Sequence, residues 1–130
     1  MANPDLSTAR IGQASINVHD MEKAVAFYRD ALGLRFLFQA GTKMAFFDCA
    51  GLRLMLALPE KPEFDHPGSI FYFQVDNIRA VAGTLQSRGV QFEAPPHVIA
   101  RMPDHELWMT FFRDSENNLL ALMSEVRSAT

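Results

Sequence analysis

The residues best suited to chemistry gather between positions 97 and 108. They are His97, Arg101, Asp104, His105, Glu106 and Trp108. Alternation along a predicted strand places His97 and Arg101 on one face, where His97 would serve as a base or hydrogen-bond donor and Arg101 as a clamp for an anion. The acidic and basic residues at 104–106 are consecutive, so in a hairpin they point in different directions. A solvated, charged hairpin tip is therefore the simpler interpretation of that part.

Two further histidines lie outside this group, and so does the single cysteine. His19 stands just before a predicted helix, either near the mouth of a cavity or on a solvated loop, and the loop is the more common case. His66 falls in a proline-rich connector and is expected to be exposed. Cys49 precedes a turn with no histidine to activate it, so the sequence does not support a nucleophilic role.

The first half of the chain is predicted to form one strand, one helix and three further strands. Residues 11–18 alternate between apolar and polar side chains, which predicts a strand with one dry face. Asp20 is a suitable N-cap for a helix that ends at Gly33. Short apolar runs separated by turn residues then predict strands at 35–39, 44–48 and 52–58. A connector with three prolines follows at 59–67.

The second half repeats this plan. Residues 69–75 alternate again, Asn77 is the next N-cap, and the second helix ends at Gly89. The remaining strands are predicted at 90–93, 98–102, 107–113 and 119–125, where the first two could form one strand broken at Pro95 and Pro96. Two copies of one plan are too few for an open array, so a paired, pseudo-symmetric sheet is the natural arrangement.

Several stretches occur in an order that resembles the vicinal oxygen chelate superfamily, also called the glyoxalase, bleomycin-resistance and extradiol-dioxygenase fold. These stretches are Ser15 to Met21, Ala26 to Tyr28, Leu32 to Leu34, Phe73 to Asp76, and Phe112 to Leu119. The resemblance covers about residues 11–125 and implies an α+β fold. Its two βαβββ modules, at about 11–60 and 68–126 of a single domain spanning 1–130, would form a cupped mixed sheet with the helices outside. It also implies a homodimer.

The two faces of the predicted strands differ in composition, because one is apolar and the other mixes polar and apolar side chains. The apolar side chains suit the face that the helices cover, whereas the opposite, mixed face would line the cup and bind a ligand. The residues predicted to bind that ligand are Gln13, Asn17, Met55, Ile70, Tyr72, Gln74, His97, Arg101, Ala121 and Met123. The alternative interpretation is that this mixed face is exposed to solvent and binds no ligand.

The resemblance also implies where metal-dependent members hold their ion, at four positions on the first and last strand of each module. Here these positions fall on Gln13, Ile70, Met55 and Ala121. Of the four side chains, Gln13 alone offers a hard oxygen donor, whereas Zn²⁺, Mn²⁺ or Fe²⁺ needs several histidine or carboxylate ligands. We therefore expect no metal and no other cofactor.

The function expected from these features is metal-independent binding of a small organic molecule, as in the drug-sequestering members of the superfamily. Two alternatives stay open. One is a glyoxalase-related lyase or dioxygenase with an atypical metal site that uses Gln13 and His97, or with histidine acid–base chemistry alone. The other is an interaction module whose cavity is filled by its own side chains.

The overall composition excludes several other classes. The net charge of −3 argues against a general nucleic-acid binder. No apolar run is long enough for a membrane span, and residues 1–10 lack the apolar segment of a signal peptide. One cysteine excludes a disulfide framework within the chain and suits a reducing compartment, so we expect a cytoplasmic protein.

Overall fold

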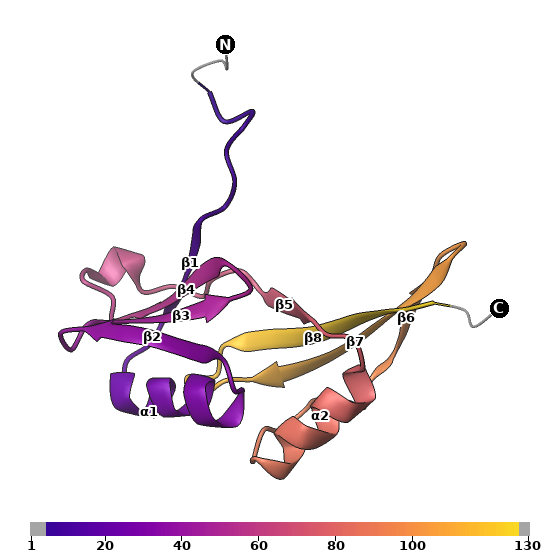
Figure 1. Ribbon diagram of the computed structural model, residues 1–130. Helices are drawn as coiled ribbons and strands as arrows, with labels where there is room; N and C mark the ends of the chain where they lie inside the picture. The colour runs from indigo at the N-terminus through magenta and orange to yellow at the C-terminus, as the bar shows by residue number, and fades with distance from the viewer. Residues whose placement is uncertain (1–4, 128–130) are drawn as a thin grey trace.

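The computed structural model describes residues 5–127, which form two four-stranded mixed sheets (Figure 1). Each sheet consists of the four strands of one βαβββ module. The first sheet has the strand order β1-β4-β3-β2. Its strands are β1 (Gln13–Asn17), β2 (Arg35–Ala40), β3 (Met44–Cys49) and β4 (Leu52–Ala57). β1 runs parallel to β4, and the other pairs are antiparallel.

The second sheet repeats this topology in the order β5-β8-β7-β6, with β5 parallel to β8. Its strands are β5 (Phe71–Gln74), β6 (His97–Arg101), β7 (His105–Arg113) and β8 (Leu119–Arg127). The segment expected as a strand at 90–93 contributes a single bridge, between Phe92 and Phe112. The α+β fold with two βαβββ modules is therefore confirmed.

The two helices begin where the sequence predicts. Asp20 caps α1 (Met21–Ala26) by accepting from the Lys23 N–H at 3.1 Å, and Asn77 caps α2 (Ile78–Ser87) by accepting from the Ala80 N–H at 3.1 Å. Each cap satisfies one of the N–H groups that a helix start leaves without a partner. α1 continues into a π-helical turn, η1 (Phe27–Ala31), and a short 3₁₀ turn, η2 (Pro62–Phe64), lies in the connector.

Both helices lie on the same side of the sheets (Figure 1). The side chains they cover form the core, which includes Ile16, Val18, Tyr28, Phe47, Leu54, Leu56, Phe112, Leu120 and Leu122. Apolar residues recur at every second position of β1, β4 and β8, as the predicted period-two pattern requires. Neither α1 nor α2 covers the opposite face of each sheet, and we call these surfaces the first and second open faces.

A β-bulge interrupts the alternation in each outer strand, β2 and β6. In β2 the register shifts between Phe36 and Phe38, and in β6 it shifts between Val98 and Ala100. One inserted residue reverses the face on which all later residues lie. The bulges thus occupy equivalent places in the two modules and change which side chains reach the open faces.

No helix within residues 5–127 is long and apolar enough to cross a membrane.

Candidate functional site

The first open face combines amide, thioether and aromatic side chains. Gln13, Ser15 and Asn17 alternate along β1, and Ser15 lies directly opposite Met55 in the register with β4. The Gln13 amide nitrogen is 3.8 Å from the Met55 sulfur, so these two predicted site residues are in contact. Asn17 is engaged with the connector, because its amide donates to the carbonyls of Phe64 and His66.

The second open face gathers most of the other predicted site residues. Tyr72 pairs with Ala121, and Gln74 pairs with Met123. Met123 pairs in turn with Met109 on β7, which lies opposite His97 on β6. Phe111 shares this face, and its ring meets the Tyr72 ring edge-on at a centroid distance of 6.0 Å. The face is therefore apolar and sulfur-rich, with polar groups at intervals.

Arg101 departs from the predicted arrangement. The β6 bulge leaves His97 opposite Met109, on the second open face, but places Arg101 opposite Glu106. Arg101 binds Glu106 at 3.1 Å, and Glu106 also accepts from the Trp108 ring N–H on the side of the sheet that faces α2. The expectation that His97 and Arg101 share one strand face is therefore wrong, because a period-two pattern does not reveal an inserted residue.

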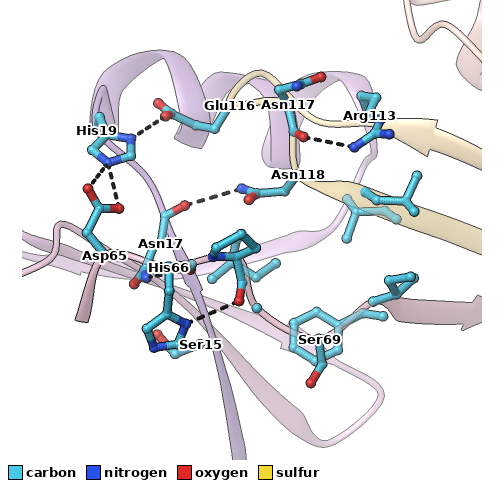
Figure 2. A pocket seen from close by; sticks show the side chains of 17 residues that line it. Ser15, Asn17, His19, Asp65, His66, Ser69, Arg113, Glu116, Asn117 and Asn118 are labelled. Atoms are coloured by element: carbon cyan, nitrogen blue, oxygen red, sulfur yellow. Dashed lines mark hydrogen bonds and ion pairs between the residues drawn. The ribbon is translucent and has the colours of Figure 1, made fainter. Parts of the chain in front are cut away.

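A cavity of about 530 Å³ lies at the seam between the two modules (Figure 2). Of the predicted site residues, Asn17 and Ile70 line it, whereas the other eight do not. The rest of its wall comes from β1 and the loop at His19, from the end of the connector and the start of β5, and from the turn between β7 and β8 with the strand ends that flank it. The seam cavity therefore includes Ser15 and Asn17 of the first open face, but most of the predicted site residues do not line it.

His19 stands at the edge of the seam cavity between two carboxylates (Figure 2). Its Nε2 is 2.9 Å from Asp65 of the connector, and its Nδ1 is 3.0 Å from Glu116 of the β7–β8 turn. The hydrogen bond with Asp65 and then that with Glu116 raise the pKa of His19. His19 is thus an exposed loop residue, as the sequence favoured, and it also lies at the edge of the cavity, where it links three segments.

This link predicts a pH-dependent contribution to stability. Because the pKa of His19 is higher in the folded state, its contribution is complete below the unfolded pKa of about 6.5 and is lost as pH rises through the folded pKa. We expect the difference in melting temperature between the natural protein and His19→Asn to be larger at pH 5.5 than at pH 8.5. A His66→Asn control, at a ring that contacts the neighbouring Pro67 carbonyl, should show no such trend. Equal differences at both pH values would contradict the prediction.

A buried network fastens the two modules together beside the seam cavity. The Tyr28 hydroxyl donates to Asp114 at 2.5 Å, and Asp114 also accepts from Asn118 and from the backbone N–H of Glu116. The Asn118 amide donates to the Asn17 carbonyl at 3.2 Å. Burial, followed by the Asp114 charge, raises the pKa of the Tyr28 hydroxyl, which therefore remains a donor.

The four positions at which the resemblance implies metal ligands present a poor donor set. They carry the amide of Gln13, the thioether of Met55 and the hydrocarbon side chains of Ile70 and Ala121. Among residues 5–127 no three His, Cys, Asp or Glu side chains are placed to hold an ion together. His97 cannot complete this ligand set, because β6 lies at the edge of the second sheet farthest from β5. The residues present do not fit a divalent metal ion.

The first open face also carries two aromatic rings and a cation that were not among the predicted site residues. Phe46 on β3 lies opposite Met55, and Phe38 on β2 lies opposite Phe46. Arg53 on β4 lies opposite Gln13. The alternation of β4 indicates the face of Arg53, but no sequence signal marks the bulge that brings Phe38 to it.

Two mixed sheets built from successive βαβββ modules define the architecture of the vicinal oxygen chelate proteins, and comparisons with known proteins agree. The family described as the glyoxalase/bleomycin resistance protein/dioxygenase superfamily matches residues 10–122. The chain belongs to this superfamily. The comparison with curated proteins gave no match. The homodimer expected from the resemblance stays a prediction.

Solved structures share the fold at low sequence identity. A superfamily member from Sphaerobacter thermophilus DSM 20745 is 28% identical, with a TM-score of 0.73 over 90% of this chain and 98% of that one. A lactoylglutathione lyase from Agrobacterium tumefaciens is 22% identical, with a TM-score of 0.71 over 89% and 93%. A glyoxalase/bleomycin resistance protein/dioxygenase from Alicyclobacillus acidocaldarius is 20% identical, with a TM-score of 0.70 over 96% and 95%.

Proposed function

We propose that this protein binds a small organic molecule on its open sheet faces without the help of a metal ion. The observation that carries the proposal is the chemistry of the four positions at which the resemblance implies metal ligands, where Gln13 is the single hard donor among thioether and hydrocarbon groups. Such a surface supplies apolar contact area and a few polar groups that orient a ligand, which is the usual composition of a small-molecule site. Binding alone requires neither a base nor a Lewis acid.

The amides are the groups that would orient the ligand. Gln13 and Gln74 are both exposed, and the one side-chain hydrogen bond of Gln13 within the described residues is with the weakly accepting sulfur of Met55. Each amide therefore keeps strong donors and acceptors for a ligand. Met55 and Met123 lie on the same two faces, and their flexible thioethers adapt to irregular apolar shapes.

The test begins with elemental analysis of protein purified without an affinity tag, followed by a thermal-shift screen of small organic compounds. We expect no stoichiometric transition metal and at least one stabilising compound. Gln13→Ala should weaken binding of that compound about three- to tenfold, the loss expected for one net hydrogen bond. Gln86→Ala, an exposed glutamine on α2, is the matched control and should leave binding unchanged.

Two results would reject the proposal. The first is a stoichiometric Zn, Fe, Mn or Ni ion whose removal abolishes ligand binding. The second is the failure of every compound to stabilise the protein. If a hit is instead converted to a product and Gln13→Ala abolishes that turnover, the enzyme alternative replaces simple binding.

A further inference from the structure

The first open face carries a stacked pair of phenylalanine rings that the core does not use. The Phe38 and Phe46 centroids are 4.7 Å apart with an interplanar angle of 29°. Phe46 is 8% exposed, but Phe38 is 49% exposed. The bulge after Phe36 is the reason that Phe38 lies here rather than against α1. A large ring is therefore displayed flat on the sheet, backed by a second ring.

A positive charge flanks the same pair. The Arg53 guanidinium lies over the Phe46 ring, with its carbon 5.8 Å from the ring centroid. Within residues 5–127, Arg53 forms no ion pair. Asp48 stands opposite it in the register, but the Asp48 carboxylate accepts from the Gly51 N–H at 3.1 Å. The guanidinium therefore retains donors that suit an anionic group.

We propose that the first open face binds a planar aromatic molecule that carries a negatively charged substituent such as a carboxylate. The ring stacks on Phe38 and the substituent binds Arg53, with the neighbouring Gln13 amide as a further donor. This inference rests on the proposed function and names the class of its ligand. An open, flat aromatic surface favours a flat partner, because offset stacking adds to the area that is buried.

The charge of the surface selects among flat molecules. Arg53 attracts an anion and repels an aromatic cation, whereas an uncharged ring gains the stacking alone. A saturated molecule of the same charge keeps the contact with Arg53 but loses the interaction between ring faces. Ring and charge therefore make separable contributions, and three probes of similar size distinguish them.

The probes are 2-naphthoate, its saturated counterpart decalin-2-carboxylate, and the cation 2-naphthylmethylammonium, each titrated into the full chain and followed by NMR and calorimetry. We expect 2-naphthoate to bind at least several-fold more tightly than either of the others. Phe38→Leu should weaken 2-naphthoate about two- to tenfold. Arg53→Gln should weaken it about two- to fivefold, as befits an exposed ion pair.

Each variant has a matched control. Phe64 is 48% exposed in the connector, so Phe64→Leu removes an equally exposed ring elsewhere. Arg79 lies over the Trp108 ring at 4.8 Å on the side of α2, so Arg79→Gln removes an equivalent cation. Both controls should bind 2-naphthoate as the natural protein does. Circular dichroism and an unchanged melting temperature establish that Phe38→Leu is folded.

Several outcomes would overturn the inference. They are equal affinity for the naphthoate and its saturated counterpart, unchanged affinity in Phe38→Leu, and no binding of 2-naphthoate at its solubility limit. Analytical sedimentation supplies a further contrary outcome. If Phe38→Leu converts a dimer to monomers and leaves the affinity for naphthoate unchanged, a second copy of this chain covers Phe38. A compound from the thermal-shift screen that needs Gln13 but not Phe38 would overturn this inference and leave the proposed function standing.

Discussion

Replacing Asp114 by alanine is expected to lower the free energy of unfolding by about 3–5 kcal/mol. Asp114 is 6% exposed, and its carboxylate accepts from the Tyr28 hydroxyl, the Asn118 amide, and the backbone N–H groups of Glu116 and Asn118. Alanine would leave the buried Tyr28 hydroxyl without this acceptor and would remove the support of the turn. Each buried group left unsatisfied costs about 1–3 kcal/mol, which is why the loss is large.

Urea unfolding, followed both by far-UV circular dichroism and by the fluorescence of the single tryptophan, would measure this effect. Tyr28→Phe should lose less, about 1–2 kcal/mol, because Asp114 keeps its other donors. Asp104→Ala is the matched control: Asp104 binds His105 and Arg127 at an exposed hairpin tip, and its removal should scarcely move the unfolding midpoint. A loss below about 1 kcal/mol in Asp114→Ala would show that the network does not hold the modules together.

The elements that position the site were predictable because their signals are local. Asp20 and Asn77 precede apolar residues at helical spacing, and in the structure both side chains cap the helices that follow. The alternation of 11–18 and 69–75 reflects strands with one face against the core, and β1 and β5 lie within those ranges. Repetition of the plan in both halves then indicated the fold.

The surfaces that carry function were harder to predict, because they depend on single insertions and on distant contacts. One inserted residue in β2 and one in β6 decide that Phe38 joins the first open face and that Arg101 leaves the second. The partners of His19 are equally distant in the sequence, since Asp65 belongs to the connector and Glu116 to a turn of the other module. No residue pattern within one segment predicts a contact between residues so far apart in the sequence.

Phe47→Ala is expected to lower the free energy of unfolding by about 3–5 kcal/mol. Phe47 is fully buried, and its ring centroid lies 5.5 Å from that of Phe36 and 6.0 Å from that of Tyr28. Removing the ring leaves a cavity beneath η1 that a packed core fills only in part. Urea unfolding of the variant beside the natural protein would measure the loss.

The sharpest comparison is with Phe38→Ala, a change of the same type in the neighbouring strand. Phe38 is 49% exposed on the face opposite the core, so its loss should change the free energy of unfolding by no more than about 1 kcal/mol. Phe47 should thus govern stability, and Phe38 should govern the affinity for an aromatic anion. If Phe38→Ala were as destabilising as Phe47→Ala, Phe38 would belong to the core, and the bulge in β2 would serve packing rather than binding.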